Sequence, residues 1–94
     1  MEFEFDPDKR KKNLEKHKID FAVGMRLIAS SNKLVKLDDR KDYGESRYQA
    51  IGEVEGVFVI TAFTMRDGVF RIISVRKAHQ KEVRFYLESL EEER

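Results

Sequence analysis

The chain has 94 residues, of which 39% are charged and 40% hydrophobic, and its formal net charge is +1. This length suits one core, so we expect residues 1–94 to form a single domain. The near-neutral charge excludes a uniformly basic nucleic-acid-binding surface, and the lack of cysteine excludes disulfides and thiolate chemistry. No segment resembles a signal peptide or a membrane span, so we expect a cytoplasmic protein without a membrane partner.

The first half of the sequence predicts a short strand followed by two helices. Residues 3–5 alternate between apolar and charged side chains, as a strand does. Asp6 and Pro7 are typical of a helix start, Asp6 as N-cap and Pro7 at the first helical position, and this helix extends to His17. A second helix over 21–29 follows an aspartate cap and has the stronger apolar face.

The second half predicts four strands and a last helix. In chain order, these elements are strands 34–37, 47–54, 57–65 and 69–77 and a helix over 78–90, with a polar loop over 38–46. Two-residue turns at Glu55-Gly56 and Asp67-Gly68 connect the last three strands as hairpins. The order β-α-α-β-β-β-β-α predicts an α+β fold, with two N-terminal helices and a C-terminal helix packed on a mainly antiparallel sheet.

Pairing across the hairpin turns predicts a polar cluster on one face of the sheet. Two-residue turns pair Thr64 with both Arg71 and Arg47, and cross-strand partners share a face. The cluster contains Glu45, Arg47, Gln49, Thr64, Arg66 and Arg71, with Ile51, Ile60, Ile73 and Val75 further along the same face. The opposite face collects Tyr48, Ala50, Phe63, Met65, Phe70 and Ile72 and is expected to be the core.

The positions of Arg76 and Lys77 depend on whether the last strand is regular. In a regular strand Arg76 is five residues from Arg71 and faces the core side, while Lys77 lies on the arginine face. A β-bulge between the two arginines would bring Arg76 to the arginine face. The sequence leaves both arrangements open.

The polar cluster suits cleavage of RNA by internal attack of a 2′-hydroxyl group. That reaction needs a base for the hydroxyl, an acid for the leaving oxygen and cations for the charge on the phosphate. Glu45 is the candidate base, and arginine suits the last role because its planar fork binds two phosphate oxygens. The reaction requires no metal, and two histidines without cysteine do not form a zinc ligand set.

The sequence resembles the BrnT toxin family from Phe3 to Tyr86. Residues 3–9, Asn13 and residues 16–21 resemble the family's opening F-E-W-D-P-x-K…N…K-H-G-V-x-F. Residues 42–47 with Ile51-Gly52 resemble its middle motif, and residues 71–78 with Glu82 and Tyr86 resemble its signature R-I-I-S-A-R-x-A…E…Y. The departures are Phe5 for tryptophan, Lys18 for glycine and Val75 for alanine.

This resemblance implies a RelE-like fold and a type II toxin that inhibits translation as a metal-independent endoribonuclease. It implies a cognate BrnA-like antitoxin that neutralises the toxin, with promoter DNA contacted only through that antitoxin. The implied substrate is mRNA, either free or on the ribosome. With Glu45 as the candidate base, the implied functional positions are Arg66, Arg71, Arg76, Lys77 and Tyr86.

Further candidate RNA-binding residues are Lys9, Lys12 and His17 of the first helix, together with Arg47 in the sheet. Their ordinary alternatives are a solvated basic surface and a half-buried histidine, and for Tyr86 the alternative is core packing. For the whole protein, the alternative is a non-catalytic RNA- or protein-binding module. Both functions predict salt-sensitive RNA binding, but only the toxin predicts cleavage.

Overall fold

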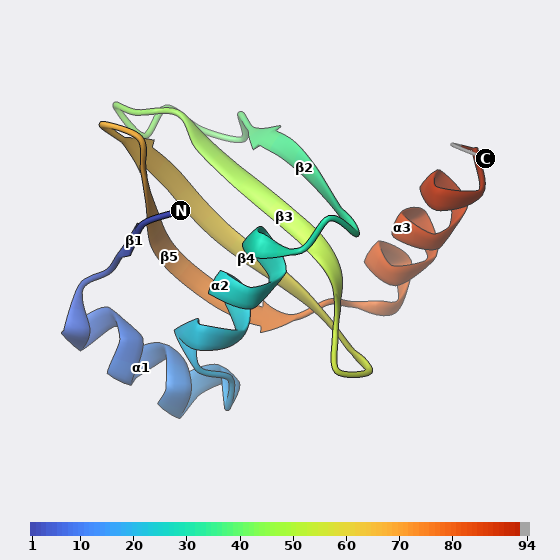
Figure 1. Cartoon of the computed structure of the whole chain (residues 1–94), viewed down its shortest axis with the longest axis horizontal. Coiled ribbons are helices and arrows are strands. Elements are labelled where there is room, and N and C mark those ends of the chain that lie inside the picture. The colour runs from blue at the N-terminus through green and yellow to red at the C-terminus, as the bar shows by residue number, and fades with distance from the viewer. Residues whose placement is uncertain (93–94) are drawn as a thin grey trace.

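In the computed structural model, which describes residues 1–92, three helices accompany a five-stranded sheet (Figure 1). The elements are β1 (Phe3–Glu4), α1 (Pro7–His17), α2 (Phe21–Ala29), β2 (Lys33–Asp38), β3 (Arg47–Val54), β4 (Val57–Arg66), β5 (Val69–Lys77) and α3 (Gln80–Glu92). The predicted α+β class and element order are confirmed. The expected single domain over 1–94 includes two residues that lie outside the described range.

The strands lie in the order β1-β5-β4-β3-β2, with β1 parallel to β5 and every other pair antiparallel. The two predicted hairpin turns are present, and both of their residues have positive φ, as the tight turns that fit twisted strands require. The predicted pairing of Thr64 with Arg71 and with Arg47 is confirmed.

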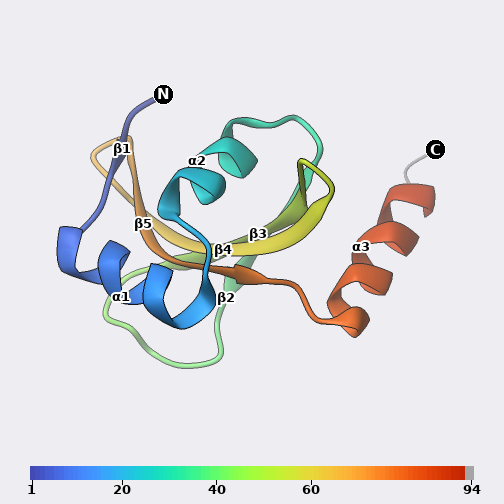
Figure 2. The ribbon, with the colours of Figure 1, turned by 90° about the horizontal axis from the view of Figure 1, so that it is seen from below.

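Helix α2 covers one face of the sheet, and the core lies between them (Figure 2). Phe21, Leu27 and Ile28 of α2 are buried there. A Cβ on Gly24 would lie 2.6 Å from Val75 Cγ2, so only glycine allows α2 to come this close to β5. Asp20 occupies the predicted N-cap position, but its carboxylate accepts two hydrogen bonds from Arg10 of α1, at 2.6 and 2.7 Å.

Helix α1 packs along the outer edge of β5 through a buried asparagine. The Asn13 side chain accepts a hydrogen bond from the N–H of Val75 at 3.1 Å and donates one to its carbonyl at 2.8 Å. It also donates to the carbonyl of Ile19 at 3.0 Å. The amide of Asn13 therefore takes the place of a neighbouring strand where β1 has ended, which protects the exposed edge of β5.

A β-bulge in β5 decides the open question about Arg76. Phe63 pairs with Ile72, whereas Ala62 pairs with Ser74, so Ile73 is the extra residue and the faces exchange beyond it. Arg76 consequently pairs with Ile60 and lies on the arginine face. The placement of Val75 and Lys77 on that face was wrong for the same reason.

Helix α3 stands beyond one end of the sheet (Figures 1 and 2). It begins at Gln80 rather than residue 78, because the N–H of Ala78 still donates to the carbonyl of Phe58 and extends the pairing of β5. Tyr86 attaches α3 to the rest of the protein. It is 3% exposed, its ring meets Phe58 edge-on, and its hydroxyl donates to the carbonyl of Asn32 at 3.1 Å.

Candidate functional site

The sheet face opposite α2, called the open face below, carries the arginines of the predicted site. They fall into two clusters. The turn cluster lies near the Asp67-Gly68 turn and consists of Glu4, Glu45, Arg47, Arg66 and Arg71. The helix cluster consists of the Asp38–Arg40 pair, whose Asp38 lies opposite Arg47 in the sheet, and the Arg76–Glu82 pair, which lies toward α3.

In the turn cluster, each arginine lies beside a carboxylate. Arg66 donates to Glu45 Oε1 at 2.8 Å, and Arg47 Nε lies 3.5 Å from the other oxygen of that carboxylate. Arg71 forms an ion pair with Glu4 of β1 at 3.4 Å. The parallel pairing of β1 with β5 places these two residues side by side, which the sequence analysis did not anticipate.

The neighbouring arginines change the basicity of Glu45, the candidate base. Its pKa is lowered, mainly by the hydrogen bond from Arg66 and further by Arg47. Glu45 is therefore ionised at neutral pH and able to accept a proton, but it is a weaker base than an ordinary glutamate. The pKa of the candidate base is thus shifted away from neutrality in this structure.

Arg47 is held by an aromatic ring as well as by Glu45. Its guanidinium carbon lies 4.1 Å from the centre of the Tyr43 ring, and Lys41 Nζ lies 5.0 Å from the same centre. Arg47 Nε is buried and makes no hydrogen bond within residues 1–92. Cation–π contact and the Glu45 carboxylate together fix the position of this guanidinium.

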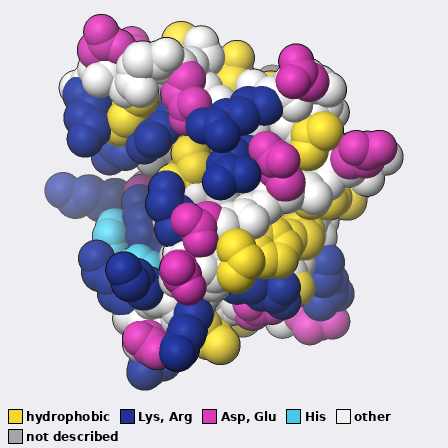
Figure 3. Space-filling model, turned by 90° about the vertical axis from the view of Figure 1, so that its left-hand side faces the viewer, with side chains coloured by type: hydrophobic (Ala, Val, Ile, Leu, Met, Phe, Trp, Pro, Cys, Tyr) yellow, Lys and Arg dark blue, Asp and Glu magenta, His cyan; other side chains and the backbone are white. Residues whose placement is uncertain are grey.

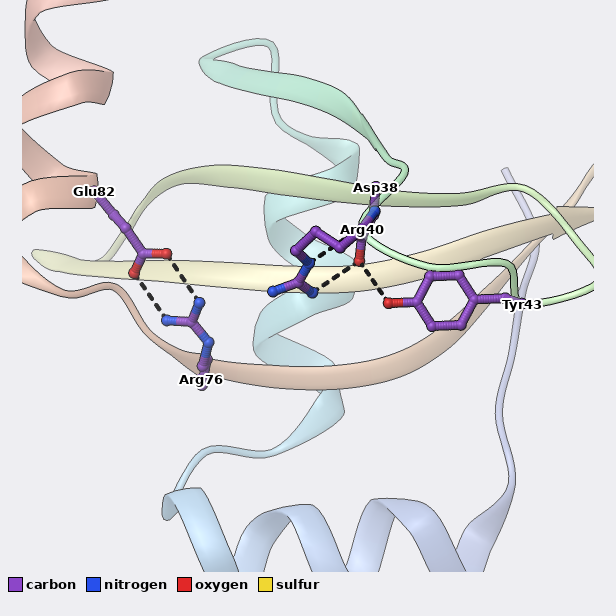
Figure 4. A network of polar contacts seen from close by, with 5 residues as sticks. All are labelled: Asp38, Arg40, Tyr43, Arg76 and Glu82. Atoms are coloured by element: carbon purple, nitrogen blue, oxygen red, sulfur yellow. Dashed lines mark hydrogen bonds and ion pairs between the residues drawn. The ribbon is translucent and has the colours of Figure 1, made fainter.

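In the helix cluster, Arg76 and Glu82 form a bidentate pair. Both guanidinium NH2 groups of Arg76 donate to the Glu82 carboxylate, each at 2.9 Å (Figure 4). Glu82 also accepts from the N–H of His79 at 2.7 Å, which caps the start of α3. This environment, chiefly Arg76, lowers the pKa of Glu82 to about 2.

The second half of the helix cluster was missed by the sequence analysis. Asp38, the last residue of β2, has a side chain that is 6% exposed and accepts two hydrogen bonds from the Arg40 guanidinium at 2.8 Å. Its Oδ2 also accepts from the Tyr43 hydroxyl at 3.2 Å. These bonds hold the pKa of Asp38 far below its usual range, chiefly through Arg40. The residues lie at or beyond the end of β2, where strand periodicity gives no prediction.

Arg71 and Arg76 lie too far apart to hold one phosphate, whereas Tyr43 contacts both Asp38 and Arg47 and so connects the two clusters. Arg71 pairs with Thr64, and Arg76 pairs with Ile60 four residues away on β4. At the usual rise per residue, this separates the two rows by about 13 Å. The open face therefore offers two positions for negative charge along one direction of the sheet.

The remaining predicted residues lie outside both clusters. Tyr86 is buried in the attachment of α3, and Lys77 pairs with Val59, on the face that carries the core. Lys9 and Lys12 are exposed and His17 is half-buried, all on α1, which runs past the β5 edge in Figure 4. On the side of the molecule that carries β1 and α1, lysine and arginine side chains gather among acidic ones (Figure 3).

Within residues 1–92, no group of three or more His, Cys, Asp or Glu side chains is arranged to hold a metal ion. No helix in the same range is long and apolar enough to cross a membrane.

The fold and the open face define a small α+β protein with arginine and carboxylate groups suited to phosphodiester chemistry. Residues 5–82 match the model of the BrnT family, described as ribonuclease toxins of type II toxin–antitoxin systems. The chain belongs to this family, and it is therefore a ribonuclease toxin whose type implies an antitoxin partner. A comparison with curated proteins gave no match.

Proposed function

We propose that this toxin is an endoribonuclease that cleaves mRNA on the open face, without a metal, by attack of a 2′-hydroxyl on the adjacent phosphate. The observation that carries the proposal is the turn cluster, in which Arg47, Arg66 and Arg71 surround one end of the face beside Glu45. Inhibition of translation would follow from loss of the message.

Three groups of the turn cluster have a role in this reaction. Arg66 and Arg71 would bind the non-bridging oxygens and stabilise the charge that develops on the phosphate. Glu45 would accept the proton of the 2′-hydroxyl, the bond between phosphorus and the 5′-oxygen would break, and the leaving 5′-oxygen would take a proton from water. Since Arg66 lowers the pKa of Glu45, the carboxylate becomes a stronger base only when this arginine turns toward the phosphate.

Residues outside the turn cluster would bind the RNA or support the site. The bulge brings Arg76 to the open face, where it would contact the RNA backbone about 13 Å from Arg71. Lys9, Lys12 and His17 would attract RNA from the β5 edge, while Lys77 lies at the end of that strand. For Tyr86, whose side chain is buried, we propose a positioning role through the attachment of α3.

A BrnA-like antitoxin is the proposed partner. Covering the open face would neutralise the toxin, and promoter DNA would be contacted only through the antitoxin. Such an antitoxin would supply acidic side chains, because Arg66, Arg71 and Arg76 each form an ion pair with a carboxylate in this structure.

The experiment is an RNA cleavage assay with purified protein in EDTA, followed by analysis of the product ends. Wild-type protein should give 2′,3′-cyclic phosphate ends, and Arg71→Ala should reduce cleavage at least tenfold, as loss of a charge-stabilising donor does. Arg26→Ala is the matched control, because Arg26 pairs with Glu55 on an exposed surface away from the open face. A folded wild-type protein that binds RNA without cleaving it would support the non-catalytic module instead.

A further inference from the structure

A groove of about 740 Å³ lies between α3 and the open face. Its floor is apolar and includes Ile51 and Ile60, and its volume is in the range of sites that bind small molecules. Phe85 of α3 forms part of the wall, and 59% of this residue is exposed. Nothing in the described chain covers this aromatic ring, although large aromatic side chains usually pack in a core.

The charges around the groove are unevenly placed. Lys36 of β2 and Lys81 of α3 line it, together with Glu82. The only other carboxylate of the lining, Glu92, lies ten residues further along α3, about 15 Å away along the helix. The groove therefore carries two lysines, of which Lys81 directly precedes Glu82 at the start of α3.

Arg40 extends from the loop after β2 across the sheet toward the Arg76–Glu82 pair (Figure 4). The buried carboxylate of Asp38 binds its Nε and one NH2 group, which leaves the other NH2 group to solvent, and the side chain is 70% exposed. Glu82 raises the pKa of Arg76, and the positive charge of Arg40 opposes this rise to a small extent. Two guanidinium groups, each bound by a carboxylate, thus lie within electrostatic reach of one another on the open face.

We propose that Arg40 and Arg76 hold one phosphate of single-stranded RNA and that the adjoining nucleoside lies in the groove with its base against Phe85. This inference rests on the proposed function and adds a second nucleotide position, at which Arg76 lies about 13 Å from Arg71. Cations beside an exposed aromatic ring are the combination that binds single strands, because the cations hold the backbone and the ring stacks on a base.

The test measures binding of a single-stranded 2′-O-methyl RNA, which cannot be cleaved because it lacks the nucleophile, over a series of salt concentrations. Each phosphate contact contributes a slope of about −0.7 to the dependence of log K on log salt. Arg40→Gln should therefore make this slope less steep by about 0.7 and weaken binding about fivefold at about 0.1 M salt. Phe85→Ala should weaken binding at least fivefold, since it removes a stacking surface, and leave the slope unchanged.

Arg26→Gln is the matched control, because it also removes one exposed, ion-paired arginine but lies on α2 and pairs with Glu55. It should change neither the slope nor the affinity. If Arg40→Gln unfolds, Lys36→Gln and Lys81→Gln serve in its place, because both line the groove and neither forms an ion pair within residues 1–92.

Arg40→Gln with the affinity and slope of the wild type would overturn the inference. So would a loss of antitoxin binding alone in the Arg40 and Phe85 variants, which would assign the groove to the protein partner. The proposed function fails separately. If Arg71→Ala abolishes cleavage while Arg40→Gln binds normally, only the second nucleotide position is wrong. If the wild type binds RNA in the way described and never cleaves it, only the cleavage proposal is wrong.

Discussion

Replacing Glu82 by glutamine tests how far the Arg76 pair holds α3 and the open face together. Glutamine keeps the length of the side chain and an oxygen for the N–H of His79, but it removes the charge that the two NH2 groups of the Arg76 guanidinium contact at 2.9 Å. We expect the variant to be less stable at neutral pH, because Arg76 would keep its charge at a partly buried position without a carboxylate beside it.

The magnitude follows from the pKa of Glu82, which Arg76 and the other contacts lower from 4.5 to about 2. This difference corresponds to at most about 3.4 kcal/mol of folding free energy. The two side chains are 27% and 29% exposed, so solvent screens the pair and we expect about 1–2 kcal/mol. Because the folded pKa is below the ordinary value, this contribution is present above pH 4.5 and is lost as the pH falls toward 2.

Urea unfolding of wild type and Glu82→Gln at neutral pH and at several acidic pH values measures this difference directly. The deficit of the variant should shrink steadily below pH 4.5, because protonated Glu82 no longer binds Arg76 as an ion pair. Glu55→Gln is the control, since its pair with Arg26 is mostly exposed and should contribute no more than about 1 kcal/mol. A deficit that stays constant with pH, or one no larger than that of the control, would refute the reasoning.

Three further changes test the packing that positions the site, each by urea unfolding at neutral pH. Asn13→Ala should destabilise the protein by about 2–4 kcal/mol, because the N–H and carbonyl of Val75 lose their buried partner; a change below about 0.5 kcal/mol would contradict this. Lys18→Gly should stabilise by about 0.5–1 kcal/mol, since Lys18 has φ of 62°, whereas Lys18→Ala should not. Gly24→Ala should destabilise by about 1–3 kcal/mol because its Cβ would overlap Val75, and unchanged stability would contradict the close approach of α2.

The pairing of the three central strands could be predicted because two physical constraints agree there. The Asp67-Gly68 and Glu55-Gly56 turns fix the register, and alternation along the strands fixes the faces. These constraints predict that Thr64 pairs with both Arg71 and Arg47, as it does in the structure. The turn cluster was therefore accessible from the sequence, apart from Glu4, whose parallel pairing is not set by any turn.

The helix cluster could not be predicted, for a different reason. The bulge at Ile73 is an extra residue within an apolar run, so no change in composition marks it. It lets Val75 reach the core, where it is fully buried, and turns Arg76 to the open face. Arg40 reaches the same face from a loop, where side-chain direction depends on tertiary contacts such as that with Asp38.

The carboxylates of the open face determine how RNA can bind there. Five arginines and four carboxylates leave the two clusters with one net positive charge, so RNA binding exchanges carboxylate partners for phosphate partners. Each exchange costs an existing ion pair and so limits nonspecific affinity. It also releases a carboxylate beside the bound phosphate, and when Arg66 leaves Glu45 the pKa of this carboxyl rises again. We therefore expect the base for 2′-hydroxyl attack to form only where RNA occupies the turn cluster, which couples binding to cleavage.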